Sequence, residues 1–372
     1  MTNRRTYLDF NASAPLRPEA REAMLAALDL CGNPSSVHAE GRSARAVVDE
    51  AREAVAALVN ASPAEVVFTS GATEANTWAL SAPWQQIAVS GIEHDSVRAP
   101  AALVAAQRGA RTIDLPVSGD GTANHKAADL DNGALIVLQL ANNETGVLQD
   151  VQAAGLWATE NGARLHTDAV QAPGRVAIDF RTLGASTMSL SGHKIGGPMG
   201  IGALVVGAGV ALNPLLKGGG QERRRRAGTE NVAAIAGFGA AAKAAQRDLA
   251  DMSRVAGMRD QLEAEVLRLT PDAIIIGKAA PRLANTSCIA LPGQHAETLV
   301  IKFDLAGIAV SAGSACSSGK VAASHVLTAM GFAPEAAGSA IRVSIGASTT
   351  EQDIAAFLAA WKAVSVNRQL AA

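Results

Sequence analysis

Three short polar segments of this 372-residue chain carry residue types that could do chemistry, and each of them follows an apolar run. Residues 70–76 (SGATEAN) lead into a helix that begins near Ala72, so free backbone N–H groups and the Thr73 hydroxyl could bind a phosphate. Asp168 lies in the segment HTDAVQ, directly after a second apolar run. Lys194 ends the segment SGHK and precedes a glycine-rich turn, where the backbone can approach a ligand closely.

Each segment has an ordinary structural explanation when it is taken alone. A Ser or Thr followed by Glu can form a capping box, an acid after a strand often caps a helix, and most lysines are simply solvated. Pyridoxal phosphate, however, needs a phosphate site, a carboxylate at its ring nitrogen and a lysine that forms a Schiff base. The three segments supply these groups together, and so they predict a pyridoxal-phosphate site.

The elements that must position these segments alternate between short apolar runs and longer helical patterns. Seven strand-like runs cover residues 65–70, 87–90, 112–115, 134–140, 164–167, 187–190 and 202–206. This alternation predicts an α/β domain in which a mostly parallel seven-stranded sheet lies between helices. Because ligands bind beyond the carboxyl ends of the strands in such sheets, we expect the polar segments to meet at one edge.

A second, smaller domain is predicted after a long helical stretch at residues 232–269. The chain beyond it contains two helical patterns and four strand-like runs, at residues 273–276, 287–291, 308–311 and 340–344. Strands and helices in this arrangement indicate an α+β domain. We therefore predict a large cofactor-binding domain of residues 11–248 and a small domain formed by residues 1–10 and 249–372.

Composition excludes several other classes of protein. Hydrophobic residues make up 48% of the chain and charged residues 18%, which is enough for a large core and excludes disorder. Only 3% of residues are aromatic, and 32 basic against 34 acidic side chains indicate neither nucleic-acid nor membrane binding. The longest uncharged stretch, residues 195–216, contains six Gly and two Pro, which would break a membrane helix. With no apolar leader at its start, the chain is expected to be cytoplasmic.

The order of the polar segments, together with other blocks along nearly the whole chain, resembles the class V aminotransferase superfamily of pyridoxal-phosphate enzymes, which has fold type I. More narrowly, the chain is similar to the NifS/IscS-type cysteine desulfurases. The blocks that carry this resemblance are YLDFNA (7–12), GNPSSVH (32–38), FTSGATE (68–74), EH (93–94), NNETG (142–146), HTDAVQ (166–171), SGHK (191–194), GGGQE (218–222), GTEN (228–231), SAGSACSSG (311–319), SHVL (324–327) and IR (341–342).

The resemblance implies how the ring of the cofactor would be held. Lys194 would carry the cofactor as a Schiff base and then move a proton at the Cα of the substrate. Asp168 would keep the ring nitrogen protonated, so that the ring accepts electrons. Gln171 would hydrogen-bond the phenolic oxygen, and His94 would stack on the ring face and act in proton transfer.

The resemblance also implies which residues would bind the cofactor phosphate and the substrate. The phosphate would be bound by four residues, Ala72, Thr73, Ser191 and His193. A Thr at the position of Thr229 reaches the phosphate of the neighbouring subunit in this family, which implies a homodimer. Asn143 and Arg342 would bind the substrate carboxylate, a task that suits the arginine fork. No metal site is expected, because the seven His residues have no metal-ligand spacing.

Cys316 distinguishes the chain from an ordinary aminotransferase. It lies in GSACSSG, a small and polar segment with Gly at each end, which is typical of an exposed loop. Its thiolate would attack the sulfur of the substrate, and a nearby base or cation should help to ionise it. Cys288, in an apolar strand-like run, and Cys31 are interpreted as structural residues. With three Cys and no CxxC motif, neither a disulfide framework nor a zinc finger is indicated.

The reaction that this resemblance implies is conversion of L-cysteine to L-alanine, with a persulfide left on Cys316. The sulfur would then pass to an acceptor protein, such as an iron–sulfur scaffold or another sulfur carrier. A selenocysteine lyase with the same site residues is the alternative. A non-catalytic partner protein is disfavoured because it would usually lose Lys194 or Cys316, and both are present.

Some positions depart from the family pattern without touching a named role. Arg224 occupies a position where Gly is common, Met199 one where Lys is common, and Ala312 one where Ser is common. The basic run at residues 223–226 could suggest nucleic-acid binding. Glu222 and Glu230 flank this run, so a contact at the rim of the site or between subunits is the preferred interpretation.

Overall fold

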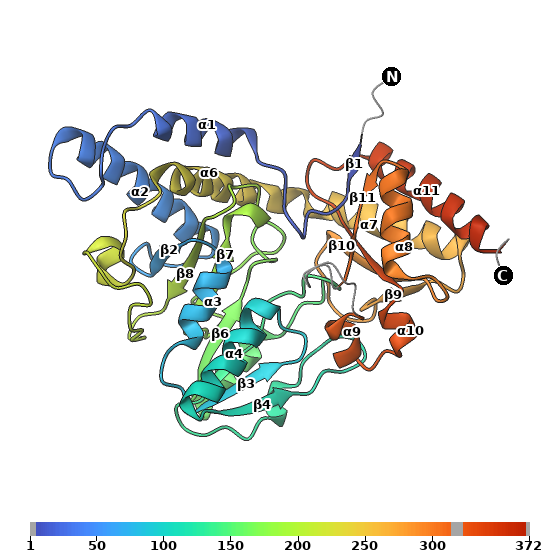
Figure 1. The fold of residues 1–372 in the computed structure, drawn as a ribbon, viewed down its shortest axis with the longest axis horizontal. Helices are drawn as coiled ribbons and strands as arrows, with labels where there is room; N and C mark the ends of the chain where they lie inside the picture. Colours follow the sequence, from blue (N-terminus) through green and yellow to red (C-terminus); the bar gives the residue numbers. More distant parts are fainter. Residues whose placement is uncertain (1–4, 314–322, 370–372) are drawn as a thin grey trace.

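Seven strands form the large sheet, which confirms the predicted α/β fold and its mostly parallel arrangement (Figure 1). The computed structural model describes residues 5–313 and 323–369. Among the described strands, β8 alone in this sheet runs antiparallel to its neighbours. The order across the sheet is β2 (Val66–Thr69), β8 (Gly202–Val206), β7 (Thr187–Ser191), β6 (Arg164–Asp168), β5 (Leu135–Val137), β3 (Gln86–Ser90) and β4 (Arg111–Leu115).

Alternate side chains of these strands enter two different hydrophobic cores. In β5, Leu135 and Val137 pack with one pair of helices, α3 (Ala72–Leu80) and α4 (Asp95–Arg108). Ile136, between them in sequence, packs with the core on the opposite face. Because side chains alternate across a strand, strands covered on both faces must be apolar throughout, as the sequence shows.

The opposite face is covered by helices from the N-terminal and middle parts of the chain. They are α1 (Pro18–Leu28), α2 (Ala39–Leu58), α5 (Val151–Glu160) and α6 (Val232–Asp248). Helix α2 begins at Ala39 because the His38 side chain accepts a hydrogen bond from the Gly41 amide and caps it. The predicted strand 134–140 is shorter in the structure, although the Leu138 and Leu140 amides still donate to the His166 and Asp168 oxygens of β6.

A second sheet of four strands has its own core. Its order is β12 (Ser311–Ala312), β13 (Ala340–Ser344), β10 (Thr286–Ala290) and β9 (Ile274–Ile276), with all pairings antiparallel. The stacked rings of Phe303 and Phe357, with centroids 5.0 Å apart, lie in this core. The helices around this sheet are α7 (Met252–Leu269), α8 (Ala296–Leu305), α9 (His325–Ala329), α10 (Pro334–Ala337) and α11 (Glu351–Gln369).

The N-terminal segment returns to this second sheet. Strand β1 (Thr6–Tyr7) pairs in parallel with β11 (Ile308–Ala309), and Leu8 belongs to the second core. In Figure 1, α6 and α7 lead from the large sheet to the small one. The precise division at residues 10/11 and 248/249 remains a prediction.

A buried ion pair fixes an unusual turn against β2. The Arg52 guanidinium contacts both carboxylate oxygens of Glu222, at 2.7 and 2.8 Å, and the Phe68 amide donates to the same carboxylate at 2.9 Å. Glu222, Arg223 and Arg224 have φ values of 46°, 57° and 65°, in the left-handed region that favours glycine. This conformation gives the physical reason why Gly is common at the position of Arg224.

Replacement of Glu222 should destabilise the fold strongly. In Glu222→Gln the buried Arg52 loses its counter-ion, so we expect the free energy of unfolding to fall by about 3 kcal/mol. Glu50→Gln is the matched control, because the Glu50–Lys243 pair is exposed and should contribute about 0.5 kcal/mol or less. Urea denaturation measures both changes, and equal stability of the two variants would contradict this account.

Candidate active site

The three polar segments meet at one edge of the large sheet, as the sequence predicts. Strand β8 is antiparallel to both β2 and β7, so β2 runs in the same direction as β6 and β7. The carboxyl ends of these three strands therefore lie together. Asp168 ends β6, Ser191 ends β7, and the turn at residues 70–71 follows β2.

The Asp168 carboxylate is buried and held by two donors. The Asn76 amide donates to its Oδ2 at 2.9 Å, and the Val170 backbone N–H donates to its Oδ1 at 3.0 Å. Both bonds give the buried carboxylate oxygens the partners that a buried polar group requires. On the same strand, burial lowers the pKa of His166 to about 4, so that its imidazole is neutral. The neutral ring lies 3.0 Å from the Asn76 Oδ1 and helps to orient the amide toward Asp168.

A chain of hydrogen bonds joins the predicted His94 to Asp168. The Nδ1 of His94 lies 2.9 Å from the Ser96 hydroxyl, and Asn76 donates to that hydroxyl at 2.9 Å. His94 also caps α4 by accepting the Ser96 amide at 3.1 Å. Sequence reasoning missed Asn76 and Ser96 as parts of the site. Asn76 could have been found in the sequence as a polar residue within the apolar face of a helix.

Lys194 lies in the 3-10 turn Gly192–Lys194 directly after β7. Its Nζ donates to the backbone oxygens of Asn11 and Ala12, at 2.6 and 3.0 Å. A Cβ on Gly192 would lie 2.8 Å from the Ile201 side chain, so glycine is needed for the close packing of this turn. The amine is therefore held by the chain segment that links the two sheets.

The start of α3 fits the phosphate of the predicted cofactor. Within the described ranges, the amides of Ala72 and Thr73 have no hydrogen-bond acceptor, and the preceding Gly71 gives no side-chain cap. A Cβ on Gly71 would meet nothing within 4 Å, so the space above these amides is open. Gly202 packs directly beneath the turn, where a Cβ would lie 2.8 Å from Gly71. A helix N-terminus that is open in this way binds anions.

The remaining predicted phosphate ligands are placed differently. Ser191 is buried and His193 is half-buried near this edge, and burial together with the neighbouring Lys194 lowers the pKa of His193 to about 4. Thr229 is exposed. Arg226, three residues before it, pairs with Glu74 at the start of α3, at 3.0 Å. This ion pair brings the Thr229 segment toward the first turn of α3.

Gln171 is held between two backbone segments. Its Nε2 donates to the Asn11 oxygen at 3.1 Å, and its Oε1 accepts a hydrogen bond from Arg175. The amide is thereby fixed beside the oxygens that hold Lys194. This position agrees with the predicted role of Gln171 near the ring of the cofactor, a role that stays a prediction.

Arg342 and Asn143 are brought together from different sheets. The guanidinium of Arg342, in β13, donates to the Asn143 backbone oxygen at 3.2 Å and to Asp9 Oδ1 at 2.7 Å. Its Nε is buried and has no partner in the described chain. An unsatisfied buried donor is costly, so this nitrogen is available to a ligand such as the predicted carboxylate. The partner Asp9, in the block YLDFNA, was missed.

Glu144 is a buried carboxyl beside the predicted substrate site. Its Oε2 accepts a hydrogen bond from the Ser324 hydroxyl at 2.6 Å, and burial raises its pKa to about 7. A Cβ on Gly313 would lie 2.3 Å from this carboxyl, so that only glycine fits there. Cys316, the predicted nucleophile, lies outside the described residues.

The other two cysteines differ in burial. Cys288 is fully buried in β10, and burial raises the pKa of its thiol, which agrees with a structural residue. Cys31 is exposed, so the interpretation of it as a structural residue has no support from packing. The described part of the chain contains no cluster of His, Cys, Asp or Glu that could hold a metal ion. Within the same ranges, no helix is both long and apolar enough to cross a membrane.

Comparison with known proteins confirms the predicted fold and the resemblance. The "Aminotransferase class-V" family matches residues 6–357. A "Cysteine desulfurase" of Cereibacter sphaeroides is 42% identical, covering 94% of this chain and 93% of the relative. An "IscS-like cysteine desulfurase" of Mycobacterium tuberculosis is 37% identical over 95% and 94% of the two chains. A NifS-like protein from Rickettsia africae has a TM-score of 0.89 at 32% identity, covering 97% and 99%.

Removal of the Asn76 amide should weaken cofactor binding. Asn76→Ala leaves Asp168 without its side-chain donor, so we expect the affinity of the apoprotein for pyridoxal phosphate to fall by about 10- to 100-fold. Titration followed by absorbance measures this change, and Asn132→Ala, at an exposed position, is the control. An unchanged affinity in Asn76→Ala would contradict the role assigned to the amide.

Glu144 should make the protein less stable as the pH rises. The folded protein keeps a proton on this carboxyl up to a pKa of about 7, whereas the unfolded chain loses it near 4.5. Stability therefore falls between these pH values, by up to about 3 kcal/mol. Glu144→Gln should remove this part of the slope in urea denaturation between these pH values. The exposed Glu297→Gln is the control, and identical slopes in both variants would refute the prediction.

Proposed function

The chain belongs to the class V aminotransferase family, and from this premise we propose that it is a pyridoxal-phosphate-dependent cysteine desulfurase. It converts L-cysteine to L-alanine and retains the sulfur. Relatives named as cysteine desulfurases, 37 to 42% identical over nearly the full chain, support this activity. A solved structure of SspA in complex with cysteine, with a TM-score of 0.79 at 29% identity over 91% of this chain and 98% of that one, supports the substrate.

The observation that carries the proposal is the convergence of four groups from separate segments. The amine of Lys194, the carboxylate of Asp168, the open amides at the start of α3 and the guanidinium of Arg342 surround the same edge of the large sheet. The lysine amine would bind the ring of pyridoxal phosphate, the aspartate its ring nitrogen, and the amides its phosphate. The guanidinium would bind the carboxylate of an amino-acid substrate. A pyridoxal-phosphate aminotransferase would use the same four groups, and Cys316 is the residue that distinguishes a desulfurase from it.

The roles of these residues follow from their chemistry. Pyridoxal phosphate, when bound, supplies an electron sink for bond breaking at the Cα of the substrate. Asp168, oriented by Asn76 and the Val170 amide, would hold a proton on the ring nitrogen. Lys194 moves a proton at the substrate Cα. Arg342 binds the substrate carboxylate with the donor that is otherwise unsatisfied.

Further side chains hold the cofactor in place. The N–H groups of Ala72 and Thr73, with Ser191 and His193, bind the phosphate. Gln171 would donate to the phenolic oxygen, and His94 would stack on the ring. Asn143 contacts the substrate carboxylate beside Arg342.

The sulfur goes to Cys316. Its thiolate forms an S–S bond with the substrate sulfur while the Cβ–S bond breaks, and the released electron pair at Cβ takes up a proton to give alanine. The sulfur remains on Cys316 as a persulfide, so the electrons balance without an external oxidant. An acceptor protein then removes it, as an iron–sulfur scaffold or another sulfur carrier would.

The active form that we propose is a homodimer in the cytoplasm. Thr229 is exposed, so its side chain is accessible to a second subunit. In the dimer it reaches the phosphate site of the other subunit. The exposed Leu215 and Leu216 in the same region support a covered surface there.

Two cysteine variants test the reaction. With L-cysteine and a reductant, the wild type should release alanine and sulfide one to one. Cys316→Ala should lose at least about 100-fold in alanine formation, because no thiolate accepts the sulfur. Cys31→Ala, which removes the exposed Cys31 thiol, should retain full activity.

The outcomes separate the alternatives. Equal alanine formation by Cys316→Ala and the wild type would remove Cys316 from the mechanism. If Cys316→Ala still released selenide and alanine from L-selenocysteine while it failed on L-cysteine, the chain would be a selenocysteine lyase. Transamination of 2-oxo acids by the wild type would instead indicate an ordinary aminotransferase.

A further inference from the structure

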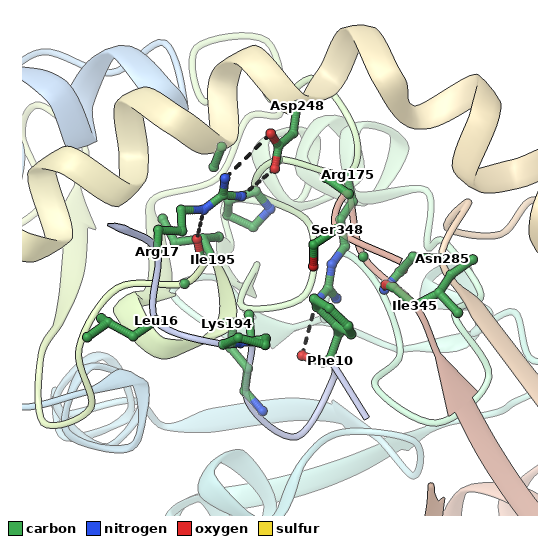
Figure 2. Close-up of a pocket in the computed structure, with 18 of the residues that line it drawn as sticks. Phe10, Leu16, Arg17, Arg175, Lys194, Ile195, Asp248, Asn285, Ile345 and Ser348 are labelled. Carbon is green, nitrogen blue, oxygen red and sulfur yellow. Dashed lines mark hydrogen bonds and ion pairs between the residues drawn. The ribbon is translucent and has the colours of Figure 1, made fainter. Parts of the chain in front are cut away.

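A cavity of about 320 Å³ lies between the two sheets, behind the segment that holds Lys194 (Figure 2). The large sheet contributes residues after β6 and β7, and the small sheet contributes residues 345–348 after β13. Lys194 lines the cavity with its stem, but Figure 2 shows its amine pointing away from Arg17, Asp248 and Ser348. The amine donates to the backbone oxygens of Asn11 and Ala12. The cavity is therefore separate from the space in which that amine acts.

Arg175 brings a positive charge into this cavity without a counter-ion. Its guanidinium donates to the Gln171 backbone oxygen at 3.0 Å, to the Gln171 side chain and to the Phe10 oxygen at 3.4 Å. All of these acceptors are neutral, and no described carboxylate pairs with it. Burial and the nearby charge of Arg342 lower the pKa of Arg175 to about 9, so it is still cationic at neutral pH. Arg175 is half-buried, and a cation partly removed from water is stabilised by an anion.

The other arginine in the cavity is already neutralised. Arg17 forms an ion pair with Asp248 and donates from Nε to the Ile195 oxygen at 2.7 Å. Figure 2 shows this pair on the other side of the cavity from Arg175, and Ser348 also lines the cavity. The remaining walls are largely apolar, with Leu16 and Ile345 among them. The free charge of the cavity is thus concentrated at Arg175.

We propose that this cavity binds a small organic anion, whose carboxylate or phosphate group pairs with Arg175 and whose apolar body packs between the two domains. An arginine guanidinium has five donors in a planar fork, which suits either group. The volume is at the lower end of the range for small-molecule sites, so the ligand is a small metabolite. The exposed Ser348, from the turn after β13, adds a hydroxyl to the lining of the cavity.

Such a ligand would act on the catalytic groups through Arg175. The same guanidinium holds the Gln171 amide and the Phe10 backbone, and Gln171 and Asn11 contact each other. The ligand would also bridge elements of both sheets. Occupancy of the cavity is therefore expected to stabilise one relative position of the two sheets.

Calorimetry on the cofactor-loaded protein tests the proposal. The probes are succinate for the carboxylate arm, glycerol 3-phosphate for the phosphate arm, and glycerol as the neutral control. We expect at least one anion to bind the wild type and glycerol not to bind. Arg175→Gln should weaken binding by about 10- to 100-fold. Ser348→Trp keeps Arg175 but fills the cavity, and should weaken binding to a similar degree.

Two further variants distinguish this cavity from other anion sites. Arg181→Gln removes an exposed arginine and should leave the affinity unchanged. Arg342→Gln removes the predicted substrate-binding arginine and should also leave most of the binding intact. Circular dichroism and the visible spectrum of the cofactor show whether each variant is folded. If Arg175→Gln does not fold, the binding measured for Ser348→Trp tests the proposal instead.

Three results would overturn the proposal. The first is no binding of either anion to the wild type at about 10 mM. The second is equal binding to the wild type and to a folded Arg175→Gln or Ser348→Trp. The third is loss of binding in Arg342→Gln alone, which would place the anion in the substrate site. Because the readout is heat of binding, none of these results depends on desulfurase activity.

Discussion

The buried carboxylate of Asp168 is the constraint on which the arrangement of the site depends. A charged carboxyl out of water is costly unless donors surround it, and here the donors come from different elements. Asn76 reaches it from α3, and the Val170 amide reaches it from the turn after β6. Asn76 is itself fixed by Ser96 of α4 and by the neutral ring of His166. Satisfying one charge therefore locks two helices to the carboxyl end of the sheet.

A second constraint acts between the two sheets. Asn11 donates from its side chain to the Asn143 oxygen at 3.0 Å and to Thr286 Oγ1 at 2.9 Å, and its backbone oxygen accepts from Lys194 and Gln171. Asn11 thus contacts the Lys194 amine, the Gln171 amide and the small sheet. A change in the position of the small sheet would be felt by Lys194 without any direct contact. The Asp9–Arg342 pair, two residues earlier in the chain, ties the same segment to the substrate-binding arginine.

The chain also places charge where the reaction does not need it. Arg175 contacts Gln171 and Phe10, and its charge has no partner among the described carboxylates. A purely structural residue at this position could be neutral, because every acceptor that Arg175 uses is neutral. The excess charge faces the cavity between the sheets rather than the edge that carries Asp168. The same segment that organises the catalytic groups thus forms the wall of a second space.

The sequence by itself determined the family, the α/β fold with seven strands, and the residue types at the end of each strand. These features depend on local patterns: apolar runs of strand length, and polar groups directly after them. It did not identify Asn76, Ser96 or Asp9, because their roles come from contacts with residues that lie 20 to 333 positions away in the chain. Tertiary structure alone decided which buried polar groups have hydrogen-bond partners and which donor of Arg342 has none. It also decided that the guanidinium of Arg175 lines the cavity. Burial and hydrogen bonding between distant segments decide such matters, and no spacing in the chain encodes them.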